Sequence, residues 1–300
     1  MDKFHTSAPT SLGIALSGLV ALAVAMGVGR FAFTPQLPLM QADLGLSFSG
    51  GGWLAVANYS GYFTGAVLAG TRGISALVLM RCGLWAVVVS TAAMAVPESF
   101  TWWLGMRFIA GIASAWVLVG TASVVLAHLA ALDARRLDGL VFAGVGIGIT
   151  LVGLICHVGA LLGLGVSVLW LALSGLALIG TLMTFKIDRK NAPLHSEGGT
   201  RMTLEAPLPR GVYSLVLCYG LFGFGYILPA TYLPSQARSL LNDPVLFGWV
   251  WPLFGMAAAL STLCVGFLVR WPRKYIWAGA QVVMAIGIFM PIVVPSLFGL

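Results

Sequence analysis

The chain has 300 residues, of which 59% are hydrophobic and 8% are charged, and its mean hydropathy is +0.99. The chain has too few polar side chains to cover the surface of a soluble globule of this length. Its composition therefore excludes a soluble protein and predicts an integral membrane protein. The formal net charge of +7 could suggest a nucleic-acid partner, but the basic residues are distributed as in a membrane protein, and we expect no nucleic acid.

Nine apolar segments of about 20 residues or more favour membrane-spanning helices over the shorter alternating strands of a barrel. The fold class predicted is therefore all-α. A cleaved signal peptide is a rival interpretation of the first segment, because Lys3 precedes it and Ala23-Val24-Ala25 has the form of a cleavage site. The predicted spans are 12–36, 51–70, 77–96, 101–127, 139–162, 165–186, 211–234, 246–269 and 276–298.

The basic residues predict the orientation of these spans. If the N-terminus is cytoplasmic, thirteen of the sixteen Lys and Arg residues lie in inner segments, Arg238 is the single outer one, and Arg30 and Arg107 lie within spans. Basic residues concentrate on the cytoplasmic side of membrane proteins. We therefore predict a multi-pass protein of a bacterial inner (plasma) membrane, surrounded by lipid, with a cytoplasmic N-terminus.

One long polar stretch, 187–210, divides the chain. It predicts an N-terminal six-helix bundle over 1–186, a cytoplasmic linker over 187–210, and a partial C-terminal bundle of about three helices over 211–300. A solvated tether explains the basic residues of the linker, and a regulatory or partner-binding role is the alternative.

Part of the chain repeats at an offset of 196 residues. The segment 27–38 returns as 223–234 with both glycines and its final Leu-Pro pair in register, and Gly52-Trp53 returns as Gly248-Trp249. Parallel repeats in a membrane chain are typical of transporters built from two related helical halves, with the solute site between the halves near the midplane.

Two arginines within spans are the main candidates for a solute site. An arginine at the centre of a spanning helix costs about 2.5 to 3.5 kcal/mol on insertion scales, so Arg30 and Arg107 require a compensating role. They lie at similar depths, about 10 Å outward of the span centres, and no acidic residue lies within a span to neutralise them. Such a pair would attract a carboxylate- or phosphate-bearing solute. Alternatively, Arg107 satisfies backbone carbonyls while Arg30 extends outward to water.

Four further residues are candidates. Tyr226 occupies the repeat position of Arg30, and Asn58 and Tyr59 lie in the middle of the second span, where they line a cavity or form interhelical hydrogen bonds. His157, near the outer end of the fifth span, is the candidate for proton coupling. Close helix packing is expected at glycine pairs spaced four apart: Gly61 and Gly65, Gly144 and Gly148, and Gly159 and Gly163.

Enzymatic and metal-binding signatures are missing from the sequence. The four cysteines are scattered through apolar spans without metal-ligand spacing, and no His-Glu-x-x-His, Gly-x-Ser-x-Gly or phosphate-binding loop occurs. We expect no catalytic residues, no metal and no cofactor.

Three motifs resemble the major facilitator superfamily, in particular its bacterial YbfB/YjiJ-like branch. They are the block from Gly27 to Met40, the run Asn58-Tyr59-x-Gly61-Tyr62, and the run from Arg107 to Ala115. The resemblance implies a helical bundle in which the first and fourth helices border a central cavity, and secondary transport of a small solute by alternating access. The loop from Gly65 to Arg81 lacks the family's aspartate, and the fifth span lacks the Gly-Pro pair of drug-proton antiporters.

The resemblance also implies twelve spans in two sets of six. At the offset of 196 residues, Leu300 corresponds to the beginning of the fourth span, which leaves three spans unaccounted for. The expectations are a naturally truncated chain or a second polypeptide that supplies the missing helices. A non-transporting remnant or membrane interaction protein is the alternative function.

Overall fold

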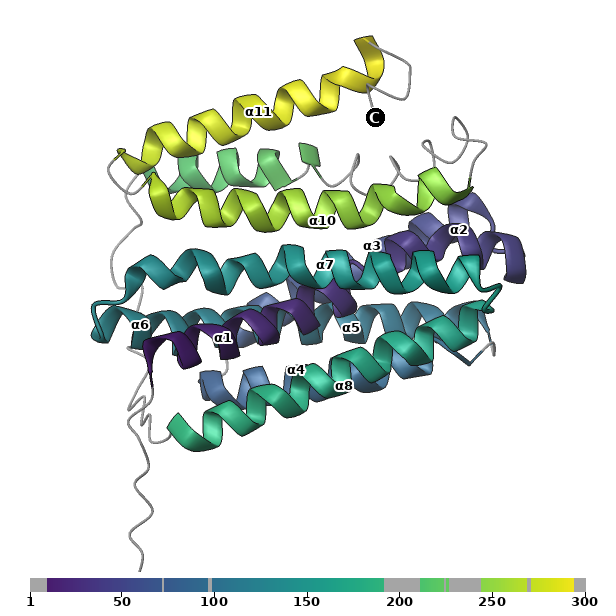
Figure 1. Ribbon diagram of the computed structural model, residues 1–300, viewed down its shortest axis with the longest axis horizontal. Helices are drawn as coiled ribbons and strands as arrows, with labels where there is room; N and C mark the ends of the chain where they lie inside the picture. Colours follow the sequence, from purple (N-terminus) through teal and green to yellow (C-terminus); the bar gives the residue numbers. More distant parts are fainter. Residues whose placement is uncertain are drawn as a thin grey trace, which may run out of the picture. The chain divides into compact units, whose positions relative to one another are not determined.

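The computed structural model describes residues 10–71, 73–96, 99–191, 211–223, 225–226, 244–268 and 271–293. These residues form nine helical spans and no strand (Figure 1). The predicted all-α fold is therefore confirmed. Six of the spans are long and apolar enough to cross a membrane, as expected for a multi-pass membrane protein.

The first span is longer than predicted and is interrupted in the middle. It consists of α1 (Ser11–Leu22), the π-helix η1 (Ala23–Arg30) and α2 (Phe33–Leu44). Thr10 caps its beginning by accepting a hydrogen bond from the backbone N–H of Gly13, and Gly45, at φ 65°, ends it in the left-handed conformation that glycine adopts without strain. The π-helix is the feature that the apolar pattern did not predict.

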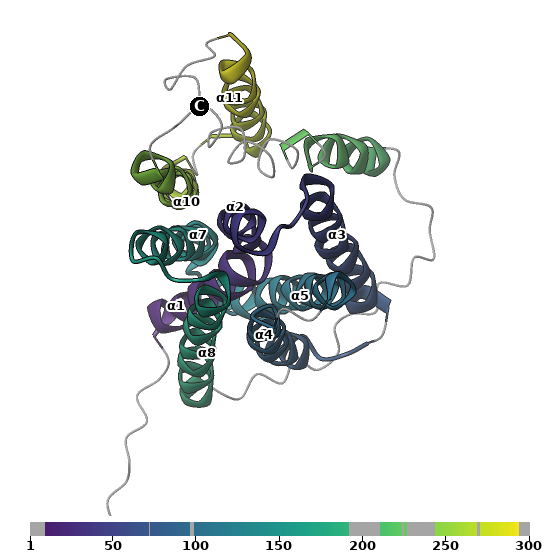
Figure 2. The same cartoon turned by 90° about the vertical axis from the view of Figure 1, so that its right-hand side faces the viewer.

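The next three spans agree with the predicted ones to within a few residues. They are α3 (Phe48–Thr71), α4 (Ala76–Ala93), and the continuous run of α5 (Phe100–Thr121), the π-helix η2 (Ala122–Leu126) and α6 (Ala127–Ala131). α5 packs against both α3 and α4 and lies between them (Figure 2). Its position allows side chains of α5 to reach the interrupted first span.

Six elements complete the described chain. They are the short η3 (Arg135–Leu137), α7 (Asp138–Leu161), α8 (Val166–Asn191), α10 (Pro244–Phe267) and α11 (Arg273–Val293), together with a helix over residues 211–223. Residues 192–210, 227–234 and 294–298, which belong to the predicted linker and to the seventh and ninth predicted spans, lie outside the described residues.

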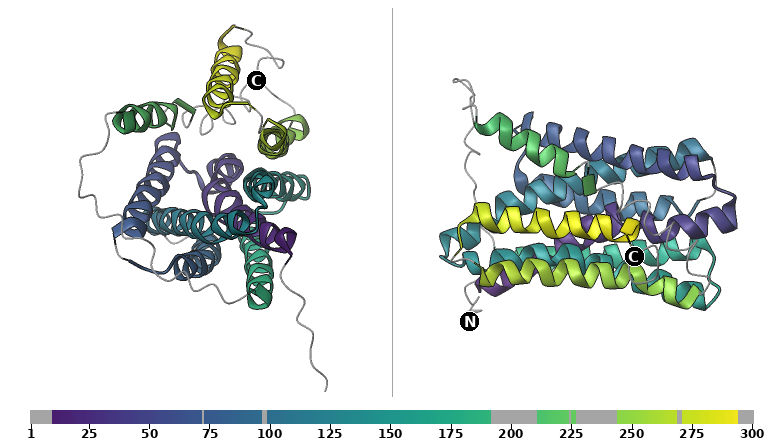
Figure 3. Two further views of the ribbon diagram at one scale, coloured as in Figure 1. Left: turned by 90° about the vertical axis from the view of Figure 1, so that its left-hand side faces the viewer. Right: turned by 90° about the horizontal axis from the view of Figure 1, so that it is seen from above.

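The chain divides into two compact units, one formed by Met1–Glu197 with Gly248–Gly266 and the other by Gly198–Phe247 with Phe267–Leu300. Most of α10 therefore belongs to the first unit, where it lies beside α7 (Figures 1 and 3). The division of the chain at 186 and 210 stays a prediction.

The repeat is visible in the helix bounds. Adding the offset of 196 residues to the first and last residues of α3 gives the first and last residues of α10, and both helices have 24 residues. The same offset places the start of α4 one residue before the start of α11. The sequence repeat is thus also a repeat of helix length and spacing.

Most of the predicted glycine contacts are confirmed. Gly61 and Gly65 face the backbone of α5, and Gly144 and Gly148 face the backbone of the first span, so a Cβ atom at any of the four would meet main-chain atoms. The last pair is different. Gly159 faces the side chain of Leu169. Gly163 follows the end of α7 at φ 67°, and a Cβ atom added there would have no neighbour within 4 Å, so the predicted packing role of Gly163 is wrong.

Candidate functional site

The interruption of the first span exposes backbone carbonyls to neighbouring helices. The N–H of Phe31 donates to the carbonyl of Met26, five residues back, at 3.0 Å, and the regular α-helix resumes only at Phe33. The turn between η1 and α2 therefore leaves the carbonyls of Gly29 and Arg30 to accept hydrogen bonds from side chains. Interruptions of this kind inside a membrane helix require such replacement donors.

Arg107 of α5 is one of these donors. Its side chain is 2% exposed, its Nη1 donates to the Gly29 carbonyl at 3.3 Å, and its Nη2 donates to the Arg30 carbonyl at 3.1 Å. Its guanidinium carbon also lies 4.9 Å from the centre of the Phe33 ring. A planar guanidinium can bridge two carbonyls in this way because its donors have fixed positions. Arg107 therefore joins α5 to the interrupted part of the first span.

Asn58 of α3 supports the same place from a third helix. Its side chain is fully buried, and its Nδ2 donates to the carbonyl of Arg107 at 3.0 Å and to that of Gly29 at 3.5 Å. Ser114 of α5 adds a hydrogen bond to the carbonyl of Ala25, at 2.8 Å. The predicted interhelical hydrogen bonding of Asn58 is thus present, and the polar residues of α3 and α5 converge on η1.

Arg30 has a different environment. The residue is half-buried, and its guanidinium lies over three aromatic rings, 4.5 Å from the ring centre of Tyr62, 5.3 Å from that of Phe31 and 5.7 Å from that of Tyr59. The faces of aromatic rings carry negative potential and attract a cation. Because η1, α3 and α5 contain no Asp or Glu, the elements around Arg30 contribute positive charge without a carboxylate.

The structure thus brings together four of the six predicted site residues, Arg30, Asn58, Tyr59 and Arg107. His157 is 7% exposed and lies elsewhere in the first unit, with its ring centre 5.4 Å from that of Trp249 and its atoms against Gly248. Tyr226 belongs to the second unit, where its ring centre lies 5.5 Å from that of Phe222, so its predicted site role stays a prediction.

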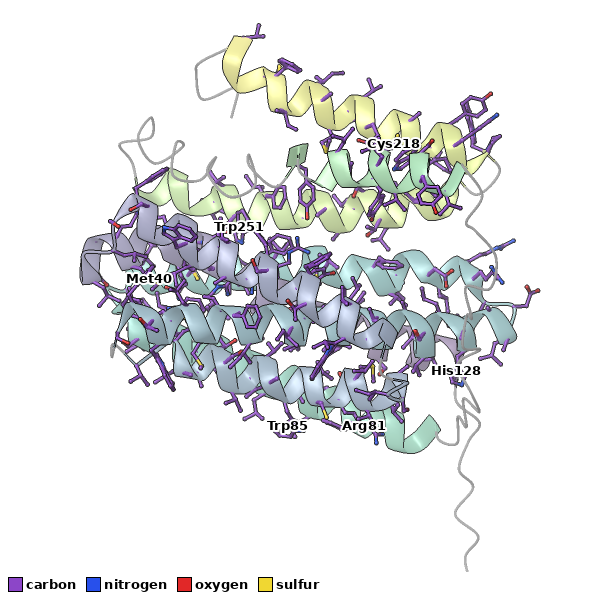
Figure 4. All side chains as sticks on the ribbon, turned by 180° about the vertical axis from the view of Figure 1, so that it is seen from behind. Met40, Arg81, Trp85, His128, Cys218 and Trp251 are labelled. Atoms are coloured by element: carbon purple, nitrogen blue, oxygen red, sulfur yellow. The ribbon has the colours of Figure 1, made fainter. Side chains whose placement is uncertain are left out.

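Sequence reasoning missed two aromatic residues near Arg30. Tyr62 lies three residues after Tyr59, a spacing that places both on one helix face and could have indicated it. Trp251 of α10, labelled in Figure 4, is 6% exposed, and its ring centre lies 6.4 Å from that of Phe31. No signal in the repeat could have indicated Trp251, since Ala55 occupies the corresponding position of the first half.

Comparison with known proteins agrees with this architecture. A search of curated proteins found no match to the chain. The model of one protein family, described as "Uncharacterised MFS-type transporter YbfB", matches residues 22–300, which include all the helices described above except residues 11–21 of α1. The chain therefore belongs to this family of transporters of the major facilitator superfamily.

Proposed function

We propose that the protein is a secondary transporter that moves a small anionic solute by alternating access, with Arg30 as the residue that contacts the anionic group. The observation that carries the proposal is the position of the half-buried Arg30, whose guanidinium lies among three aromatic rings beside η1, α3 and α5, which contain no carboxylate. A carboxylate or phosphate group would supply the opposite charge and accept the guanidinium's hydrogen bonds.

The two arginines have separate roles in this proposal. Arg107 uses both of its terminal nitrogens on backbone carbonyls, which favours a positioning role, whereas the guanidinium of Arg30 lies over three aromatic rings. The carbonyl that Arg107 binds at 3.1 Å is that of Arg30 itself. Arg107 and Asn58 would therefore fix the backbone from which the solute-binding side chain projects.

Tyr59 and His157 complete the proposal. The hydroxyl group of Tyr59 would donate a hydrogen bond to the same solute. His157 would take up the coupling proton, because it is an ionisable residue within a span and lies where α7 meets α10. The protein would reside in a bacterial inner membrane with its N-terminus in the cytoplasm.

Uptake into proteoliposomes tests the proposal. The purified full chain is reconstituted, and the uptake of radiolabelled acetate, benzoate and phosphate is compared with that of the cation choline and with protein-free liposomes. We expect uptake of at least one anion and none of choline, and loss of anion uptake in Arg30→Gln. The control is Arg81→Gln on α4, whose guanidinium lies over Phe185. Anion uptake unchanged in Arg30→Gln, or uptake of choline alone, would refute the proposal.

A further inference from the structure

Trp251 combines burial with an unsatisfied donor. Its side chain is 6% exposed, and its indole N–H has no hydrogen-bond partner among the described residues. A buried N–H without an acceptor costs free energy, because it loses its hydrogen bonds to water on folding. A solute that brings an acceptor to this position would restore such a bond.

The surroundings of Trp251 connect it to Arg30. Trp251 packs in one cluster with Met26, Phe31 and Ile149, and Tyr62 packs against that cluster. Phe31 and Tyr62 are also two of the rings beneath the Arg30 guanidinium, at 5.3 and 4.5 Å. A continuous aromatic surface therefore leads from the charge on the first span to the indole on α10.

We infer that Trp251 and Phe31 form the apolar side of the solute site, and that the solute is a carboxylate attached to a flat ring, such as an aromatic acid. This inference rests on the proposed function, because it assumes that the anionic group binds at Arg30. The carboxylate would pair with the guanidinium, and the ring would pack against the aromatic surface. Acetate would use only the charged end of this site.

The proposed role of Trp251 depends on its position beside Phe31 more than on its N–H without a partner. Trp170 of α8 is also buried, at 1% exposed, and its N–H also lacks a partner among the described residues. It packs in the main core cluster, with Leu173, Ala177 and Leu84, and that cluster does not contain Phe31. Trp170 is therefore a matched control, with the same side chain and similar burial but in a cluster that contains neither Phe31 nor Tyr62.

Binding measurements on the purified full chain test the inference. Dissociation constants of benzoate and acetate are measured by calorimetry for the wild type, Trp251→Leu, Trp251→Phe and Trp170→Leu, after each variant is shown to be folded by size-exclusion chromatography. We expect the wild type to prefer benzoate and Trp251→Leu to lower that preference about two- to tenfold, as the loss of one aromatic contact predicts. Trp251→Phe should fall between them, and Trp170→Leu should keep the wild-type ratio.

The outcomes separate this inference from the proposed function. If the wild type binds acetate and benzoate equally, or if both tryptophan positions change the ratio alike, the aromatic side of the site is refuted while anion binding stands. If the wild type binds neither carboxylate, the inference fails, and the proposed function fails as well only if the uptake assay also shows no transport of phosphate. If Trp251→Leu does not fold, the intermediate ratio of Trp251→Phe decides.

Discussion

The substitution Arg107→Lys separates a structural role of Arg107 from a solute-binding role. It keeps the positive charge but replaces two fixed donors with one ammonium group, which can satisfy either the Gly29 carbonyl or the Arg30 carbonyl but does not bridge them as the guanidinium does. Interhelical hydrogen bonds in a membrane protein average about 0.6 kcal/mol and reach about 1.7. The lost contact with the Phe33 ring adds about 0.5 to 2 kcal/mol. We therefore expect Arg107→Lys to lower the free energy of unfolding by about 1 to 4 kcal/mol.

Reversible unfolding in mixed micelles, followed by circular dichroism, measures this loss, and uptake by the same preparation measures function. A structural role predicts that stability falls while the folded fraction still transports the anion. Unchanged stability together with lost uptake would refute the reasoning, because Arg107 would then act on the solute and not on the backbone.

Three further predictions concern the packing and the proton. Gly111→Ala should lower the free energy of unfolding by about 1 to 3 kcal/mol, because the new methyl group meets the backbone of α3. Gly105→Ala on the same helix places its methyl group in open space and should not destabilise the protein. Equal melting temperatures of the two variants would contradict this prediction. Ser114→Ala should lose about 0.6 to 1.7 kcal/mol in the same unfolding assay through its hydrogen bond to Ala25, and no loss would contradict that role. His157→Gln should abolish uptake driven by a pH gradient but keep solute exchange, and gradient-driven uptake at the wild-type rate would exclude His157 from coupling.

Much of the fold could be predicted because hydrophobic length and glycine spacing are local signals. The bounds of α3, α4 and α7 follow from where apolar residues begin and end, and the repeat relates α3 to α10 directly. The π-helix over Ala23–Arg30 could not be predicted in this way, since its apolar residues fit an α-helix as well. It depends on side chains from α3 and α5 that satisfy the carbonyls it releases.

The candidate site was predictable only in part. A charge in an apolar span is conspicuous, so Arg30 and Arg107 could be identified from their position alone, but both alternatives for Arg107 were compatible with the sequence. The hydrogen-bond partners favour a positioning role for Arg107, and these partners, the carbonyls of Gly29 and Arg30, lie more than 70 positions away along the chain. Trp251 was missed for the same reason, because its proximity to Phe31 arises only when α10 packs in the first unit.

Thermal unfolding in the presence of an organic anion tests the pairing between Arg30 and the solute most directly. A ligand at 100 times its dissociation constant stabilises the folded state by about 2.7 kcal/mol, so the wild type should melt at a higher temperature with a saturating carboxylate than without it. Arg30→Gln should show no such increase, while Arg81→Gln should show all of it. An equal increase in Arg30→Gln and the wild type would contradict the account, because the anion would then bind without the guanidinium on which the proposed site depends.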